Sequence, residues 1–176
     1  MNEDIVRIAR AVDFAARKHV HQRRKGEAAE PYFNHLSEVA RLLAEATEGN
    51  DTELVIAGLL HDTIEDQEVS REELAAEFGE KVAAIVEEVT DDKSLDKAER
   101  KRLQVVKAPY KSAQAKALKI ADKTANLRAI LASPPAHWGI DRKREYFDWA
   151  KAVVDGCRGV NARLEQDFDE AYARKP

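Results

Sequence analysis

The chain has 176 residues, the length of one domain, of which 44% are hydrophobic and 35% are charged. A chain of this length buries roughly 70% of the surface that its unfolded form exposes, so we expect residues 1–176 to form a single soluble domain. The 7 Gly and 5 Pro exclude disordered and fibrous classes and favour helices over strands and turns. The net charge of −4 argues against nucleic-acid binding by bulk attraction.

The N-terminus and the cysteine content indicate the compartment. Residues 1–4 are acidic where a signal peptide would be basic, and no apolar run approaches the roughly 18 residues that a membrane-spanning helix needs. Cys157 is the only cysteine, which excludes an intrachain disulfide and argues against a thiolate zinc site. We therefore expect a cytoplasmic protein with no membrane partner.

Apolar residues recur three and four positions apart along most of the chain, the spacing of a helical face buried against a core. The first such stretch runs from Asp4 to about His19, and the second begins near His35 and ends at the turn 48–50. Further helices are predicted over 52–65, 70–78 and 82–89, from Lys97, over 112–130, and from Asp141 through Val153, with Gly156 or Gly159 as a candidate interruption. No segment alternates like a strand. The sequence thus predicts an all-α domain, a bundle of roughly eight or more helices.

Capping residues support these helix boundaries. Asp51 or Thr52 is suited to cap the helix that follows, and Ser70 with Glu73 forms the pattern of a capping box. Ser112 opens the helix over 112–130, and two consecutive prolines end it. The helices are therefore expected to begin and end close to these positions.

The helix predicted over 52–65 ends in four side chains suited to metal or proton chemistry. His61 and Glu65 are four residues apart, as are Asp62 and Asp66, so all four project within one sector of a continuous helix. Such groups at the edge of an apolar helix are costly to desolvate unless they share a positive charge, which makes a cation the simple explanation. Taken alone, a His-Asp pair at a helix end is more often a solvated final turn.

Two further candidate ligands lie elsewhere in the chain. His35 stands at a predicted helix start, and Asp122 lies inside an otherwise apolar helix, a poor place for an aspartate without a partner. From the residues alone, a salt bridge with Lys119 or Lys123 is the favoured account of Asp122.

A family resemblance adds to this pattern. The spaced set of His35, His61-Asp62 and Asp122 resembles the signature of HD-domain phosphohydrolases. The segments that resemble the hydrolase domain of the RelA/SpoT proteins are 22–25, 31–35, 60–66, 78–79, 89–92, 119–123 and 126–128. Segments 93–95, 99–101 and 145–151 are similar to the stand-alone small alarmone hydrolases of the metazoan SpoT type. The resemblance runs from about residue 8 to 165, and the chain ends soon after it, which favours the stand-alone class.

The resemblance implies an all-helical HD fold and a manganese ion. The metal ligands implied are His35, His61, Asp62 and Asp122, while Glu65 and Asp66 orient or deprotonate a bound water. Two imidazoles and two carboxylates agree with such an ion, but this ligand set also suits Fe²⁺, Co²⁺ or Zn²⁺. The reaction implied is hydrolysis of guanosine 3′,5′-bis(diphosphate) or its pentaphosphate relative at the 3′ position, releasing pyrophosphate and leaving GDP or GTP.

The resemblance also suggests which side chains bind this small-molecule nucleotide. Arg24 and Lys25 correspond to family positions beside the nucleotide, and the planar guanidinium of Arg24 can stack on the base. The remaining candidates are Lys97, Arg100, Lys101 and Arg142 for the 5′-diphosphate, Asn126 for ribose or phosphate, and Tyr146 as a further contact. Phe147 and Trp149 are expected in the core. For each cation taken singly, a solvated surface is the alternative.

Two other functions stay open at this point. The same metal site suits another phosphorylated nucleotide, such as an adenosine 3′-diphosphate alarmone or the 2′-phosphate of NADPH. A non-catalytic alarmone sensor is the alternative of a different class, and Glu65 with Asp66 counts against it, because a sensor needs no acids that activate water. The sequence does not specify an oligomeric state.

Overall fold

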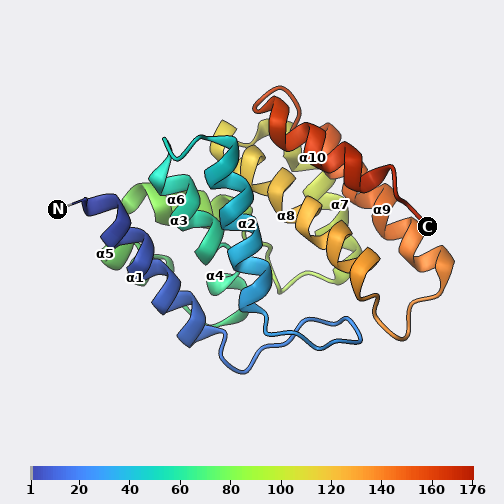
Figure 1. The fold of residues 1–176 in the computed structure, drawn as a ribbon, viewed down its shortest axis with the longest axis horizontal. Helices are drawn as coiled ribbons and strands as arrows, with labels where there is room; N and C mark the ends of the chain where they lie inside the picture. The colour runs from blue at the N-terminus through green and yellow to red at the C-terminus, as the bar shows by residue number, and fades with distance from the viewer. Residues whose placement is uncertain (1) are drawn as a thin grey trace.

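The segments with helical periodicity fold into ten α-helices and one 3₁₀ turn in the computed structural model, which describes residues 2–176. The helices are α1 (Glu3–Lys18), α2 (Phe33–Ala46), α3 (Thr52–Leu60), α4 (Thr63–Asp66), α5 (Arg71–Phe78), α6 (Glu80–Val89), α7 (Lys97–Lys107), α8 (Ala113–Ala132), α9 (Ile140–Asp155) and α10 (Ala162–Tyr172), with the 3₁₀ turn η1 at Ala108–Tyr110. Over these residues the extended pairing is a single isolated bridge between Arg23 and Pro31. The all-α prediction is confirmed (Figure 1).

The helix starts follow the predicted caps. The Asp51 carboxylate accepts a hydrogen bond from the Leu54 amide at 3.1 Å, and Ser112 caps α8 in the same way. Ser70 Oγ accepts from the Glu73 amide at 3.0 Å, but the Glu73 carboxylate pairs with a lysine of α1 instead of returning to Ser70. The predicted interruption near Gly156 is also present, because α9 ends just before this residue.

The prediction of one continuous helix over 52–65 is wrong. Helix α3 ends at Leu60, and α4 begins separately at Thr63. Asp62, with φ −103° and ψ 2°, departs from helical backbone angles, and the Thr63 hydroxyl donates to the Leu60 carbonyl at 2.6 Å. A local side-chain hydrogen bond thus replaces the helical ladder, and the break falls at His61 and Asp62.

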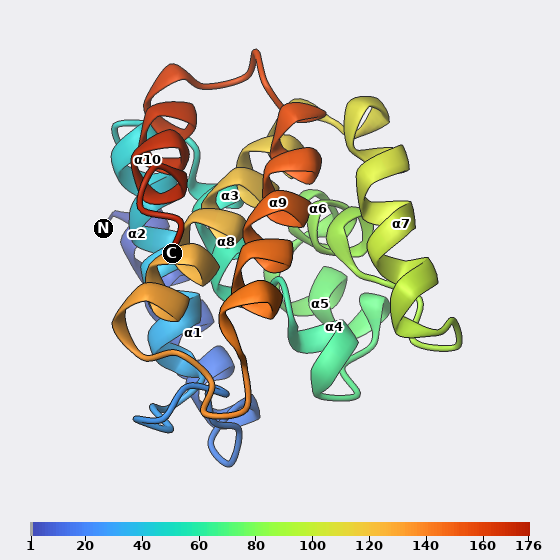
Figure 2. The same cartoon turned by 90° about the vertical axis from the view of Figure 1, so that its right-hand side faces the viewer.

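Helix α3 is the centre of the fold. It packs against α1, α2, α6 and α8, and eight of its nine residues are buried, so it is apolar all round and not amphipathic (Figures 1 and 2). Gly58 permits the close approach of α2, because a Cβ there would lie 2.8 Å from a methyl group of Leu43. The polar dipeptide that ends α3 therefore emerges directly from the core.

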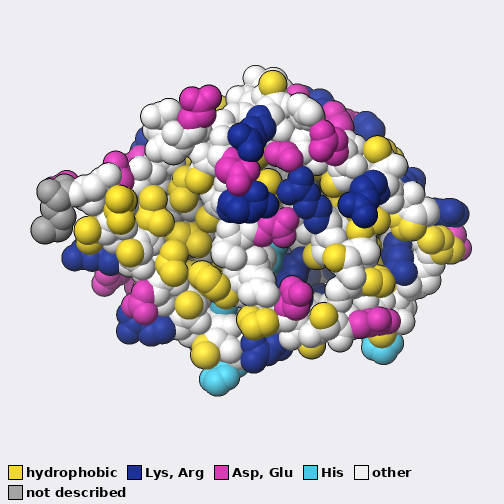
Figure 3. Space-filling model, viewed as in Figure 1, with side chains coloured by type: hydrophobic (Ala, Val, Ile, Leu, Met, Phe, Trp, Pro, Cys, Tyr) yellow, Lys and Arg dark blue, Asp and Glu magenta, His cyan; other side chains and the backbone are white. Residues whose placement is uncertain are grey.

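Helix α8 forms the second buried element, with twelve buried residues. Helices α9 and α10 pack against it, and α2 joins it to α3. On the face drawn in Figure 3, hydrophobic side chains gather over α1, where Ile5 and Val12 are exposed, whereas basic and acidic groups are interspersed elsewhere. Within the part of the chain that the structure describes, no helix combines the length and hydropathy needed to cross a bilayer.

The loop between α1 and α2 folds back and docks on the end of α8. The Ala28 amide donates to Ser133 Oγ at 3.0 Å, and the Glu27 amide donates to the Pro134 carbonyl at 3.2 Å. Gly26 is required at the contact, because a Cβ there would stand 2.2 Å from the carbonyl oxygen of Ser133. The docked loop, which carries Arg24, forms one side of a cleft.

Candidate metal centre and active-site cleft

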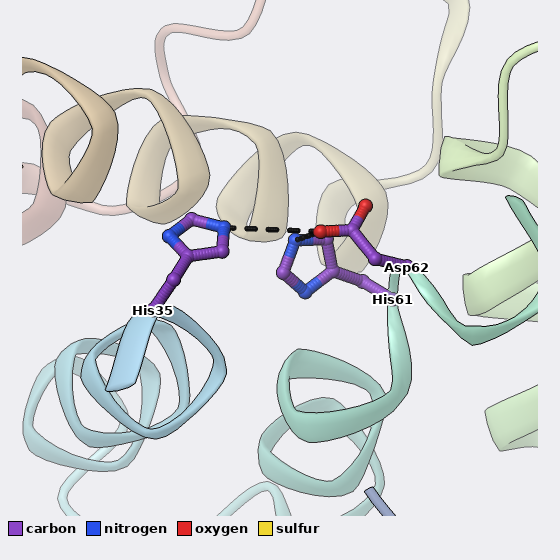
Figure 4. Close-up of side chains that lie close together, drawn as sticks. All are labelled: His35, His61 and Asp62. Carbon is purple, nitrogen blue, oxygen red and sulfur yellow. Dashed lines mark ion pairs between the residues drawn. The ribbon is translucent and has the colours of Figure 1, made fainter. Parts of the chain in front are cut away.

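The four predicted metal ligands meet where α2, α3 and α8 converge. His35 lies in the first turn of α2, His61 and Asp62 follow α3, and Asp122 lies within α8. The shortest distances join His61 Nε2 to Asp62 Oδ2 at 3.1 Å and His35 Nε2 to Asp122 Oδ1 at 3.3 Å. The crossed pairs, His35 with Asp62 and His61 with Asp122, are 3.9 and 3.8 Å apart. Figure 4 shows both imidazoles directed at the Asp62 carboxylate.

His35, His61 and Asp62 form a group that could hold a metal ion, because one ligand atom of each lies within 4.8 Å of the others. Asp122 is not part of that group, but its Oδ1 lies 3.3 and 3.8 Å from the two imidazoles. Ligand atoms about 2.1 Å from one ion lie about 3–3.5 Å from each other, close to the distances between the imidazole nitrogens and carboxylate oxygens. His61 Nδ1 lies 2.8 Å from the Gly58 carbonyl and donates to it, so Nε2 is the ring nitrogen that faces the carboxylates. Among the described residues, buried Nε2 of His61 has no hydrogen-bond partner. An imidazole oriented in this way suits a metal ligand, because a bound cation would take the place of a proton on Nε2.

The electrostatics of this cluster favour a positive charge. Burial lowers the pKa of His35. Burial also acts to lower the pKa of His61, but the carboxylates of Asp62 and Asp122 outweigh it and raise that pKa to about 10. Burial opposes ionisation of the two carboxyl groups, yet His61 beside Asp62, and Lys123 beside Asp122, hold their pKa values below the usual range. Two ionised carboxylates in a buried site attract a cation.

Each carboxylate is oriented by a neighbour. The Tyr32 hydroxyl donates to Asp62 Oδ2 at 2.6 Å, and Asn126 Nδ2 donates to Asp122 Oδ1 at 2.8 Å. Lys123 Nζ lies 2.9 Å from Asp122 Oδ2. The salt bridge expected for Asp122 is therefore present through Oδ2, while Oδ1 faces the two histidines.

The two predicted acids on α4 differ in their surroundings. Glu65 Oε2 accepts a hydrogen bond from the Asp91 amide at 3.2 Å. Burial and the nearby charges of Asp62 and Asp91 raise the pKa of Glu65. Asp66, by contrast, accepts from Gln22 Nε2 at 2.9 Å through one oxygen and from Lys93 Nζ at 2.5 Å through the other.

A cleft of about 660 Å³ opens above the cluster, a size usual for a small-molecule site. A smaller cavity of about 150 Å³ contains His61, Asp62 and Asp122 in its wall, and it shares Glu65 with the cleft. All eight predicted substrate-binding residues line the cleft, namely Arg24, Lys25, Lys97, Arg100, Lys101, Asn126, Arg142 and Tyr146. The predicted recognition groups and three of the four predicted metal ligands thus line two cavities that share wall residues, whereas His35 lines neither.

A family model described as an HD domain matches residues 11–146 of the chain. This chain belongs to the HD-domain family. The family resemblance found in the sequence is confirmed.

Alignments of this HD domain with its relatives cover almost the whole chain. Two carry the name guanosine-3′,5′-bis(diphosphate) 3′-pyrophosphohydrolase MESH1: one from Danio rerio, 49% identical over 93% of this chain and 91% of the relative, and one from Homo sapiens, 45% identical over 99% and 98%. A solved structure described as a metazoan ortholog of SpoT that hydrolyzes ppGpp aligns with a TM-score of 0.91. It is 43% identical, and the alignment covers 96% of this chain and 94% of that one.

Some side chains at the HD site were missed by sequence reasoning. Tyr32 and Lys93 lie in the motifs that carry the resemblance, but only the folded chain brings their polar atoms to Asp62 and Asp66. Trp149 was expected in the core, yet it lines the cleft with its ring 4.6 Å from Lys101 Nζ. Phe147 is buried, as expected.

Arg24 and Asn126 were both predicted to contact substrate, and here they contact each other. Arg24 Nη2 donates to Asn126 Oδ1 at 2.9 Å, and the guanidinium lies 5.6 Å from the centre of the Tyr32 ring. Because Asn126 also donates to Asp122, a hydrogen-bonded path leads from the cleft wall to this candidate metal ligand.

Proposed function

We propose that this HD-domain protein is a metal-dependent hydrolase that removes pyrophosphate from the 3′ position of guanosine 3′,5′-bis(diphosphate), leaving GDP. Its pentaphosphate relative would leave GTP. The main observation behind the proposal is that a cleft lined by cations shares Glu65 with a smaller cavity whose wall contains His61, Asp62 and Asp122. The relatives named for this reaction support the proposal. We also propose that the enzyme is cytoplasmic, and its single cysteine is compatible with a reducing compartment.

We assign a divalent cation to His35, His61, Asp62 and Asp122. Membership of the HD family supports a divalent metal, and we propose Mn²⁺ because the mixed nitrogen and oxygen ligands are softer than Mg²⁺ prefers and lack the thiolates that favour Zn²⁺. When bound, such an ion polarises water and neutralises phosphate charge.

Glu65 is the group proposed to take the proton from the attacking water. The Asp91 amide fixes one oxygen of its carboxylate, and the other has no hydrogen-bond partner among residues 2–176. The raised pKa of Glu65 makes it a stronger base than an exposed glutamate. In the reaction, the water oxygen bonds to the phosphorus attached to O3′ of the ribose. The bond from that phosphorus to O3′ breaks, and O3′ takes up a proton as pyrophosphate forms.

The cations of the cleft are proposed to bind the rest of the substrate. Lys97, Arg100, Lys101 and Arg142 are assigned to the 5′-diphosphate, and Lys25 and Tyr146 to the nucleotide. Arg24 is held over the ring of Tyr32, so it offers the flat face of its guanidinium to the base. Stacking accepts any purine, since it does not read the hydrogen-bonding edge.

Because stacking accepts any purine, a second class of substrate remains a candidate. An adenosine 3′-diphosphate analogue would stack on Arg24 equally well, as would the adenine of NADPH, whose 2′-phosphate would then be removed. A non-catalytic sensor is disfavoured, because the partly buried Glu65 carboxylate has a free oxygen where water would be activated.

The decisive experiment follows product release from a panel of nucleotides. Metal-loaded protein would be incubated with guanosine and adenosine 3′-diphosphates and with NADPH, and pyrophosphate and phosphate would be measured separately. We expect pyrophosphate from the guanosine substrate, loss of activity with a chelator, and recovery on adding Mn²⁺. No turnover of any compound in the presence of Mn²⁺ would refute the proposed function.

A further inference from the structure

Both carboxylate oxygens of Asp66 accept hydrogen bonds from other segments of the protein, whereas, among residues 2–176, only one oxygen of its neighbour Glu65 does. The two oxygens of Asp66 accept from the Gln22 amide and the Lys93 ammonium group, at 2.9 and 2.5 Å. A group that takes a proton from water must present an oxygen to that water. Glu65 has such an oxygen, whereas both oxygens of Asp66 are bound to donors from two other segments.

Gln22 is the hub of these contacts. Its Oε1 accepts from Gln67 Nε2 at 2.7 Å and lies 2.5 Å from Nδ1 of the buried His19. The orientation of the Gln22 amide follows from the partners: an ionised carboxylate only accepts, so the NH₂ group must face Asp66 and the carbonyl must face Gln67 and His19. Every polar atom of this amide therefore has a defined partner.

The hub joins parts of the chain that are far apart in sequence. His19 is the C-terminal cap of α1, Gln22 begins the loop docked on α8, Asp66 and Gln67 end α4, and Lys93 belongs to the segment between α6 and α7. Helix α4 has only four residues and no side-chain cap at its start. A helix this short is not stable by itself, so its position depends on such contacts. Glu65 is on α4, so the position of its carboxylate depends on the position of the helix.

We propose that Gln22 and Asp66 form a positioning clamp that holds α4, and through it Glu65, in place over the metal ligands. Asp66 acts through the position of Glu65 and takes no proton from the water. This inference rests on the proposed function, in which Glu65 activates the attacking water.

Exchanging the two groups of the clamp separates positioning from proton transfer. Asp66→Asn sets an amide NH₂ against the NH₂ of Gln22, and Gln22→Glu sets a second carboxylate against Asp66. In the double variant the carboxylate at position 22 accepts from the amide at position 66, whose carbonyl still accepts from Lys93. The hydrogen bonds to His19 and Gln67 are also kept. The clamp is thus restored, but an amide at position 66 cannot take a proton.

We expect each single variant to lower kcat at least about tenfold, since small displacements of a catalytic group can cost about a hundredfold. KM and Mn²⁺ affinity should change little. The double variant should recover kcat to within about threefold of the wild type, a coupling that the double-mutant cycle measures. A double variant as inactive as Asp66→Asn would overturn the proposal in favour of proton transfer by Asp66. Full activity of Asp66→Asn alone would also overturn it, because neither the clamp nor proton transfer by Asp66 would then be needed.

A further variant covers the case in which the exchanged pair folds poorly. Gln22→Met removes the clamp and leaves the Asp66 carboxylate intact, so the proposal expects a lower kcat, and an unchanged kcat would overturn it. The matched control is Gln114→Met, which breaks a similar bond, 2.7 Å to Asp51, at a pair that lines neither the cleft nor the cavity. Its kcat should stay unchanged. Wild-type protein that hydrolyses nothing refutes the proposed function itself, whereas active wild type without rescue refutes the clamp alone.

Discussion

Helices α3 and α7 position two different kinds of candidate site residue, and they differ sharply in burial. Helix α3 is buried along nearly its whole length and ends in His61 and Asp62, whereas α7 has no buried residue and carries cations such as Lys97 and Lys101. The candidate metal ligands are therefore held by the packing of the core, and the candidate phosphate contacts stand on a surface helix.

This contrast has an energetic basis. Groups that must meet within about 3–4 Å need neighbours that cannot move, and the densely packed interior supplies them. Cations can be mobile and still attract a diphosphate through several angstroms of water. Each such cation contributes a small, salt-sensitive part of the binding free energy. We therefore expect substitutions at the metal ligands to have large effects and substitutions on α7 to have small ones.

The largest effect is expected at Asp122. Asp122→Ala removes a metal ligand, so we expect metal binding and turnover to be abolished, measured by calorimetric Mn²⁺ titration and by pyrophosphate release. The variant also leaves Lys123, which is only 4% exposed, without its partner, which destabilises by about 3–5 kcal/mol. Asp62→Ala gives the same test without an unpaired lysine. Stoichiometric metal in either variant would contradict the ligand assignment.

The next largest effect is expected at Glu65. Glu65→Ala should keep the metal and lose about 10²–10⁴-fold in kcat, the range for removing a general base. Comparing its metal titration with that of Asp62→Ala separates binding from chemistry. Retained activity in the Glu65 variant would show that another group accepts the proton.

Tyr32 tests whether the groups behind the ligands matter. Tyr32→Phe removes the hydroxyl that donates to Asp62 Oδ2, and loss of such a partner weakens metal affinity about 10–100-fold. The ring and its stacking on His19 remain, so the melting temperature should change little. Unchanged Mn²⁺ affinity would mean that the core alone orients Asp62.

The smallest effect is expected on α7. Lys97→Ala should raise KM by less than about fivefold, with kcat nearly unchanged and with a weaker dependence of KM on ionic strength. Lys107→Ala is the matched control, because Lys107 is exposed on the same helix and does not line the cleft. A large loss of kcat at Lys97 would place it beside the reacting phosphate and break the contrast between α3 and α7.

The elements that sequence analysis predicted well are those fixed by local chemistry. Ser112 caps α8 and Asp51 caps α3, because a capping hydrogen bond spans only three residues. The break at His61 and Asp62 was missed because the apolar periodicity continues through it, and the hydroxyl of Thr63 that replaces the helical bond gives no periodic signal.

The sequence analysis also could not predict contacts between segments that are far apart in the chain. Gln22 and Asp66 are 44 residues apart, and nothing in either local pattern shows that they meet. The family motifs located both residues without explaining Gln22. The candidate metal ligands could be proposed from the sequence because two histidines and two aspartates occur in the order of a known family. The orientation of each side chain, such as the His61 ring with Nδ1 facing the Gly58 carbonyl, came only from the folded chain.

The close contact between Gly26 and Ser133 limits which substitutions the wall of this cleft can accept. In a library of variants at every loop position, we expect Lys25 and Glu27 to accept many residues without loss of folding, because both are exposed. Position 26 should accept none without moving the loop, because any side chain would meet the Ser133 backbone at 2.2 Å. Diversity in base recognition is therefore available at Lys25, which lines the cleft beside one fixed glycine, and selection for new nucleotides should leave that glycine untouched.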